Sequence, residues 1–240
     1  MRKSVAYALD FILDTLDYSP NELSVPGGEA DLRLQPSLDP ATKDQFCVVL
    51  WNDKKHAFGD VVKLLIDTTN KSREEASKVA VRIDEQGRDV IDMQANAARL
   101  LETARTFSQA GLGVTVRRAY DTFREQISDL IIEWILDLTR SRLGTDTHIT
   151  REVIASQLLA PRKPSTLNPN PEAQKALSEV ESPVRLDYML LYHMRLWKRP
   201  RLNLEGVYTS ILSLSHEHKL AVGGSLCVSL SKGWRLKRSF

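Results

Sequence analysis

Three polar side chains that can accept hydrogen bonds follow a short apolar run. Asn52, Asp53 and His56 come directly after the segment FCVVLW (46–51), which reads as a buried strand. A fourth polar residue, Asp84, ends a helical pattern with the apolar face Ala76, Val79, Ala80 and Ile83. If this helix packs beside the preceding one, Asp84 can face Asn52 and Asp53. Two carboxylates and an amide oxygen beside an apolar wall suit a cation attached to a hydrophobic group.

Each of these residues also has an ordinary structural interpretation. An Asn-Asp pair after a strand usually forms a turn or a helix cap, and an Asp at a helix end is usually solvated. Phe58, Val61 and Ile83 are the candidates for the apolar wall, and their alternative is plain core packing. His56 can either orient Asp53 or contact the backbone of a bound peptide.

Other catalytic and metal-binding patterns are absent from the sequence. It has no phosphate-binding glycine loop, no G-x-S-x-G and no H-E-x-x-H. His216 and His218 form an H-x-H pair without a carboxylate or cysteine at ligand spacing, and Cys47 and Cys227 lie far apart. We therefore expect no cofactor, no metal and no disulfide framework. Two cysteines fit a reducing compartment, the cytoplasm or the nucleus.

Composition narrows the class of protein. The 240 residues are 42% hydrophobic, enough for a core, and 33 basic residues balance 31 acidic ones to a net charge of +2. We therefore expect no nucleic acid as a partner. We expect no membrane either, because no stretch of the sequence approaches the ~18–20 apolar residues that a membrane span needs. The N-terminal apolar pattern predicts an amphipathic helix over 4–17, within a segment 1–18. Asp10, Asp14 and Asp17 interrupt the apolar pattern, and the apolar stretch of a secretory signal would not tolerate these acids.

The rest of the chain divides by its patterns. Residues 45–118 read as strand, helix, helix, strand, helix, strand, which predicts a small sandwich of three strands and three helices. Ser72 and Glu75 form a capping-box signal, Gly87 and Gly111 end helices, and Leu112 to Arg117 alternate as a half-buried strand. Two linkers are expected, at 19–44 and 161–183. The helical regions are 119–160, with a long helix to 142 closed by Gly144, and 184–222, beginning with a helix over 184–198. The tail at 223–240 is irregular, of the kind that a frame change or retained intron produces.

The site residues also carry a family resemblance. Asn52-Asp53-Lys54 after the strand and Ile83-Asp84 before Gly87 resemble the ClpS-like domain of bacterial ClpS adaptors and of the eukaryotic Ubr-type N-recognin ubiquitin ligases. Lys54 and Asp84 depart from bacterial ClpS, whereas Asn52, Asp53, His56 and the aromatic Phe58 resemble the eukaryotic form. The flanks SVAYALDFILDTL, GLGVTVRRAYDTFREQISDLIIEWILDL and YMLLYHMRLWKRPRLNLEGVYTSIL are similar to fungal N-recognins, so the resemblance covers roughly residues 1–223.

The resemblance implies a fold and a function. The fold is α+β: a small ClpS-like sandwich, in which a three-stranded antiparallel sheet packs on three helices, with flanking α-helical segments. The resemblance also implies recognition of degrons that begin with Phe, Trp, Tyr, Leu or Ile, with Asn52, Asp53, His56 and Asp84 at the peptide N-terminus and Phe58, Val61 and Ile83 around its first side chain. Two cysteines cannot build the family's zinc-bound UBR box or its RING domain. We therefore expect an internal fragment or truncated gene model of a larger ligase, which meets the E2 enzyme and ubiquitin only through the full-length protein and transfers no ubiquitin alone.

Three other interpretations stay open at this point. The first is a ClpS-type adaptor that hands substrates to a protease, although such an adaptor needs little beyond the core domain. The second is an enzyme in its own right, although no RING or thioester-forming site is recognisable. The third is a helical scaffold whose 45–118 domain has no ligand site.

We also expect proteases to cut first at 19–44 and 161–183.

Overall fold

The computed structural model describes residues 1–19, 25–28, 45–146, 148–163, 175, 177–178, 182–212 and 214. They fall into two compact units, one within Pro20–Arg124 and Trp197–Arg199, the other within Met1–Ser19, Glu125–Leu196 and Pro200–Phe240. Most of the predicted linkers at 19–44 and 161–183 lies outside the described residues. So do the tail at 223–240, the H-x-H pair and Cys227.

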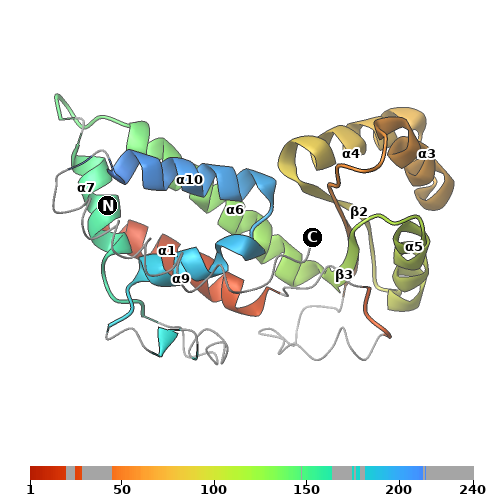
Figure 1. Ribbon diagram of the computed structural model, residues 1–240, viewed down its shortest axis with the longest axis horizontal. Helices are drawn as coiled ribbons and strands as arrows, with labels where there is room; N and C mark the ends of the chain where they lie inside the picture. Colours follow the sequence, from red (N-terminus) through yellow and green to blue (C-terminus); the bar gives the residue numbers. More distant parts are fainter. Residues whose placement is uncertain are drawn as a thin grey trace. The chain divides into compact units, whose positions relative to one another are not determined.

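The unit that holds the candidate site is an α+β domain, as predicted. Its sheet has the order β2-β1-β3, and β1 pairs antiparallel with both neighbours. The helices α3, α4 and α5 surround one face of this sheet (Figure 1). The elements of this unit follow the predicted order: β1 (Phe46–Trp51), α3 (Phe58–Thr69), α4 (Arg73–Gln86), β2 (Arg88–Gln94), α5 (Ala97–Gln109) and β3 (Val114–Arg118).

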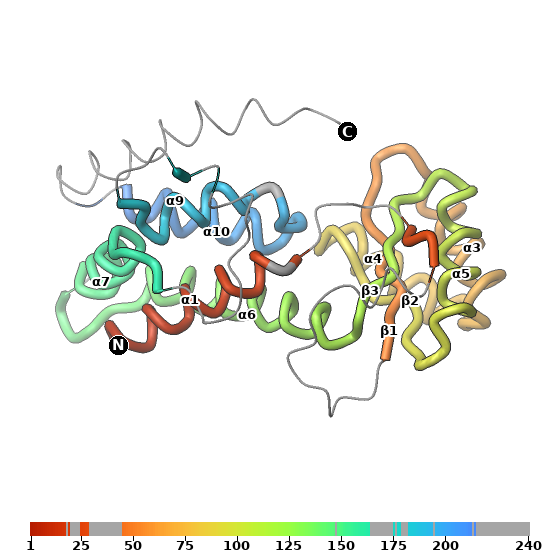
Figure 2. Tube along the Cα trace, turned by 90° about the horizontal axis from the view of Figure 1, so that it is seen from below, coloured from red at the N-terminus to blue at the C-terminus, as the bar shows by residue number. Residues whose placement is uncertain are grey.

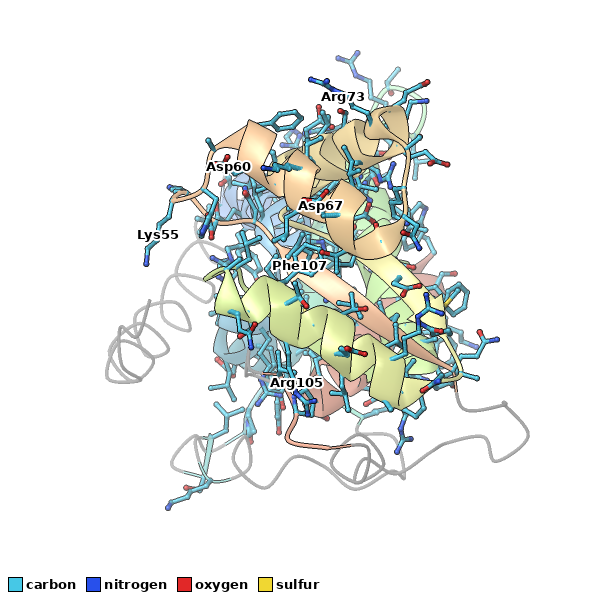
Figure 3. The ribbon with its side chains drawn as sticks, turned by 90° about the vertical axis from the view of Figure 1, so that its right-hand side faces the viewer. Lys55, Asp60, Asp67, Arg73, Arg105 and Phe107 are labelled. Atoms are coloured by element: carbon cyan, nitrogen blue, oxygen red, sulfur yellow. The ribbon has the colours of Figure 1, made fainter. Side chains whose placement is uncertain are left out.

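The core of this domain forms because alternate strand residues point to the same face of a sheet. Phe46, Val48 and Leu50 of β1 point toward the helices and are at most 1% exposed. Phe107 of α5 is fully buried against the same cluster and lies between α3 and α5 in Figure 3. One apolar face of each helix therefore closes a single core over the sheet.

Two local signals in the sequence are confirmed at the ends of α4. Ser72 accepts a hydrogen bond from the Glu75 N–H at 3.3 Å, while the Ser72 N–H donates to the Glu75 carboxylate at 2.9 Å, so the capping box is complete. Gly87 has a φ of +101°, and its N–H donates to the Ile83 carbonyl at 2.8 Å. Glycine adopts this left-handed conformation without strain, so the chain leaves α4 and enters β2 at once.

The predicted half-buried character of the third strand is wrong. β3 is buried on both faces, and Thr115 and Arg117 are only 3% and 6% exposed. Their polar groups have an aromatic partner in β1: the Trp51 Nε1–H donates to Thr115 Oγ1 at 3.2 Å, and the Arg117 guanidinium lies 5.3 Å from the centre of the Trp51 ring. Alternation of polar and apolar residues therefore does not mark a solvent face here.

The other unit is helical. It contains α1 (Arg2–Tyr18), α7 (Ile149–Leu158), α9 (Arg185–Tyr192), most of α6 (Ala119–Arg140) and most of α10 (Lys198–Leu212). Helix α1 packs against α7 and α9 (Figure 2). Its core includes buried residues from all five helices, among them Leu9, Ile12, Ile135, Ile154, Met189 and Val207. Among the described residues, no helix combines the length and the apolar character that crossing a lipid bilayer requires.

Two predicted helix ends in this part of the chain differ from the structure. The helix expected over 184–198 ends at Tyr192, is followed by a 3-10 turn at His193–Arg195, and restarts at Lys198. Pro200 explains the break, because in a continuous helix its ring would collide with the carbonyl of Leu196 and its missing N–H would leave that carbonyl without a donor. Helix α6 ends at Arg140, so Gly144 sits in the following turn with a φ of +62°.

Candidate functional site

The register of the sheet brings the end of β1 to the end of α4. Trp51 pairs with Arg88 at the start of β2, and the Asn52 N–H donates to the Gly87 carbonyl at 2.8 Å. Because Gly87 caps α4, the Asn52 side chain reaches the last helical turn. Asn52 Nδ2 lies 3.3 Å from Asp84 Oδ1 and 3.4 Å from the Asp84 carbonyl oxygen. Asn52 and Asp84, 32 positions apart in the sequence, thus form one polar edge.

Asp53 organises the loop that follows Asn52. Asp53 Oδ1 accepts hydrogen bonds from the backbone N–H of Lys55 at 2.9 Å and of His56 at 3.0 Å. Asp53 Oδ2 lies 2.7 Å from His56 Nδ1. An aspartate that accepts hydrogen bonds from backbone N–H groups two and three residues later stabilises a turn. The interpretation of Asp53 as a turn residue therefore describes much of its geometry. The structure groups the four polar residues as two pairs, Asn52 with Asp84 and Asp53 with His56.

His56 joins this loop to the end of α5. Its Nε2 lies 2.9 Å from the carbonyl oxygen of Ala110, the residue that caps α5. A carboxylate and a carbonyl can only accept hydrogen bonds, so the imidazole satisfies both when it carries a proton on each nitrogen. The hydrogen bond to Asp53 therefore raises the pKa of His56, partial burial opposes this rise, and the contact with Ala110 adds to it.

The same contacts act on Asp53 in the opposite direction. Partial burial disfavours its charged form, but the hydrogen bonds from the His56 and Lys55 N–H groups and from the His56 ring outweigh burial and lower the pKa of Asp53. Both shifts favour a carboxylate paired with an imidazolium, and the side chains of His56 and Asp53 remain 28% and 22% exposed.

The site lies beside the carboxyl ends of two helices. The last turn of α4 presents the carbonyl of Asp84, and the cap of α5 presents that of Ala110. The carbonyl end of a helix carries partial negative charge and attracts cations. Two basic side chains do lie there, because His56 contacts Ala110 and the Lys198 Nζ donates to the Asp84 carbonyl at 2.7 Å. This arrangement can hold a positively charged amine.

The three residues predicted to form the apolar wall have different surroundings. Ile83 is 4% exposed and belongs to the core cluster, and Val61 packs against that cluster while remaining partly exposed. Phe58, the first residue of α3, is 50% exposed. Core packing therefore describes Ile83 and most of Val61, whereas Phe58 offers apolar surface next to the loop.

Two features of the site have no counterpart in the sequence analysis. Lys198 is 114 positions away from Asp84 in the chain, and no pattern in the sequence connects them. The Ala110 carbonyl is a backbone group, which no side-chain motif identifies. Lys54 and Lys55 of the loop are exposed, and Lys55 extends outward in Figure 3.

Within the described part of the chain, no three His, Cys, Asp or Glu side chains gather in a way that could ligate an ion. Cys47 is buried in β1, and its thiol donates to the Thr122 hydroxyl at 3.2 Å.

Comparisons with known proteins show what this chain is similar to. Residues 41–110 match the family described as ATP-dependent Clp protease adaptor protein ClpS. The chain is also 27% identical over 172 residues to the E3 ubiquitin-protein ligase ubr1 of Schizosaccharomyces pombe. That alignment covers 67% of this chain and 9% of the relative, so the chain spans only a small part of that protein's length. The predicted resemblance is confirmed: the chain holds a ClpS-like domain within a stretch similar to a Ubr-type ligase.

Proposed function

We propose that this chain binds the free N-terminus of proteins that begin with a bulky hydrophobic residue. The proposal proceeds from its ClpS-like domain and its similarity to a Ubr-type ligase. Such N-terminal residues are type 2 N-degrons, and their recognition would select substrates for ubiquitin-dependent degradation. The observation that carries the proposal is the polar edge of Asn52 and Asp84 at the end of α4, where an ammonium group already lies against the Asp84 carbonyl.

The chemistry of an N-terminus matches this edge. A free α-amino group is an ammonium with three donors, and the Asp84 carboxylate and carbonyl are acceptors at the negative end of a helix. A hydrogen bond to a charged group contributes about 1.5–3 kcal/mol. Asn52 bonds to the same two Asp84 oxygens and so fixes their direction. We assign Asp53 and His56 to holding the loop that carries Asn52.

The hydrophobic side chain of the first residue needs apolar surface close to this edge. Phe58 presents half of its surface to solvent at the start of α3, and Val61 follows one turn later. Burying a Leu or Phe side chain contributes about 1.5–3 kcal/mol. Together with the ammonium contacts, and after the cost of association, this supports a micromolar dissociation constant, about −8 kcal/mol.

The proposal places the catalytic step outside this chain. Ubiquitin and an E2 enzyme would be partners of the full-length ligase, and this chain would supply recognition without a cofactor in the cytoplasm or nucleus. The similarity to ubr1 extends over 172 residues, more than the 41–110 match to the adaptor family. That extent favours a ligase module over a protease adaptor.

Fluorescence anisotropy with the whole chain tests the proposal. Peptides beginning with Phe or Leu should bind, whereas the same peptides acetylated at the N-terminus should not, because acetylation removes the charge and two donors. Peptides beginning with Arg should bind poorly, since no acidic residue lies among the apolar wall residues. Equal affinity for free and acetylated peptides would overturn the proposal and leave a scaffold as the better interpretation.

Substitutions then locate the site. Asp84→Asn keeps nearly the same volume but removes the charge, and it should weaken binding about tenfold or more. Asp53→Asn should weaken binding comparably, through loss of the loop geometry. Glu85→Gln is the matched control, because it removes one negative charge from the next, exposed position of α4. Lys54→Ala should change the affinity little. Equal losses in Asp84→Asn and Glu85→Gln would indicate only a general effect of charge.

A further inference from the structure

The lysine beside the candidate site contacts the group that the proposed ligand needs. Lys198 Nζ donates to the Asp84 carbonyl oxygen at 2.7 Å, and Asn52 Nδ2 lies 3.4 Å from the same oxygen. A carbonyl oxygen has two lone pairs, so these two donors occupy both. Residues 197–199 belong to the same compact unit as the candidate site, and Lys198 is exposed.

The backbone at Lys198 is held close to the end of α4. Gly87 permits this approach, because a Cβ atom there would lie 2.7 Å from the Lys198 Cβ and 2.8 Å from its backbone nitrogen. The neighbouring Trp197 adds a second contact, since the Arg88 guanidinium lies 3.4 Å from the centre of its ring. The Lys198 backbone is therefore fixed beside Asp84, while its flexible side chain can rotate away.

A lysine ammonium and a peptide α-ammonium are chemically equivalent at this position. Each carries one positive charge and three N–H donors, and neither has an acceptor. Two ammonium groups on one carbonyl would repel each other, and the oxygen has no third lone pair. Occupation by Lys198 and by a substrate N-terminus is therefore mutually exclusive at the Asp84 carbonyl.

We propose that Lys198 is an internal competitor for the ammonium position at the end of α4, and that a substrate N-terminus binds there by displacing its side chain. This inference rests on the proposed function and adds a residue that sets the affinity. The apparent dissociation constant of a peptide equals its intrinsic value divided by the fraction of chains in which Lys198 has moved away. Removing the lysine ammonium should therefore tighten peptide binding.

The test compares three variants of the whole chain by fluorescence anisotropy with a Phe-initiated peptide. Lys198→Met keeps the length of the side chain but removes the ammonium, and it should lower the dissociation constant about two- to tenfold. Lys198→Arg keeps a competing cation and should stay near the wild type. Lys54→Met is the matched control, because it removes one positive charge from an exposed position in the site loop, and it should change the affinity by less than about twofold.

The outcomes separate this inference from the proposed function. Wild-type binding that Lys198→Met leaves unchanged or weakens would overturn the competition and keep the N-degron site. An equal gain in Lys198→Met and Lys54→Met would reduce the effect to general charge and would overturn it as well. Absence of binding in every variant would overturn both. A second readout is the NMR signal of the Lys198 ammonium, which should shift with a free peptide and not with an acetylated one.

Discussion

His56 Nδ1 lies 2.7 Å from Asp53 Oδ2, while the other ring nitrogen lies 2.9 Å from the Ala110 carbonyl oxygen. Both neighbours are acceptors, so a protonated ring ties the loop after β1 to the end of α5. This contact leads to a pH dependence that can be measured at a single residue.

The pKa of His56 in the folded chain should lie above its ordinary value of about 6.5, and Asp53→Asn should lower it. NMR titration of the imidazole signals measures both. His193 is an internal control, because burial and the nearby Arg201 lower its pKa. A His56 that titrates together with or below His193 would contradict the arrangement.

The same pair determines the pH range in which it stabilises the fold. The raised pKa of His56 means that its contribution is complete below about pH 6.5 and is lost as the pH rises through the folded pKa. The lowered pKa of Asp53 means that its contribution is present above about pH 4 and is lost as the pH falls through the folded value. The difference in urea midpoint between wild type and His56→Asn should therefore be largest from about pH 4 to 6.5.

Gly87→Ala should destabilise the ClpS-like domain by more than about 2 kcal/mol. A non-glycine residue at a φ of +101° is strained, and the new Cβ would collide with the backbone of Lys198. Gly59→Ala is the matched control, since its Cβ would have no neighbour within 4 Å and alanine favours the helix. Urea unfolding of both variants measures the contrast. Similar midpoints would mean that the close approach at Gly87 is absent in solution.

Ser72→Ala should lower the stability of α4 by about 1 kcal/mol, because it removes the acceptor of the capping box. Ser77→Ala provides the comparison within the same helix. The Ser77 hydroxyl only donates to the Arg73 carbonyl at 2.8 Å, a bond that the helix does not need. Hydrogen exchange of the amides in the first turn of α4 should accelerate in Ser72→Ala alone.

Asp10 of α1 should contribute more to the stability of the fold than an aspartate in an exposed ion pair. Asp10 forms a two-bond pair with Arg185, at 2.7 Å and 2.9 Å, and Arg185 is only 3% exposed. Asp10→Asn leaves this buried guanidinium without its counter-charge and should cost about 3 kcal/mol. Asp137→Asn breaks an exposed pair with Arg140 at 3.7 Å and should cost less than about 0.5 kcal/mol. Equal shifts in thermal midpoint would contradict this difference.

Most elements of this protein could be predicted from local patterns in the sequence. The spacing of apolar residues, the Ser72–Glu75 cap and the helix end at Gly87 act within a few residues, so propensity and capping suffice to predict them. The break before Lys198 follows from Pro200 and was also readable in principle. The apolar stripe across 184–198 nevertheless predicted a continuous helix, because the spacing of apolar side chains says nothing about backbone hydrogen bonds that a proline prevents.

Only the tertiary structure decided which polar groups meet. The register of β1 against β2 puts Asn52 beside Asp84, and the cap of α5 gives His56 its second acceptor. The contact of Lys198 with Asp84 spans 114 positions. Contacts at such separations, and those made through backbone carbonyls, leave no periodic trace in a sequence. They depend on packing geometry, in which one Cβ atom at Gly87 would exclude the lysine.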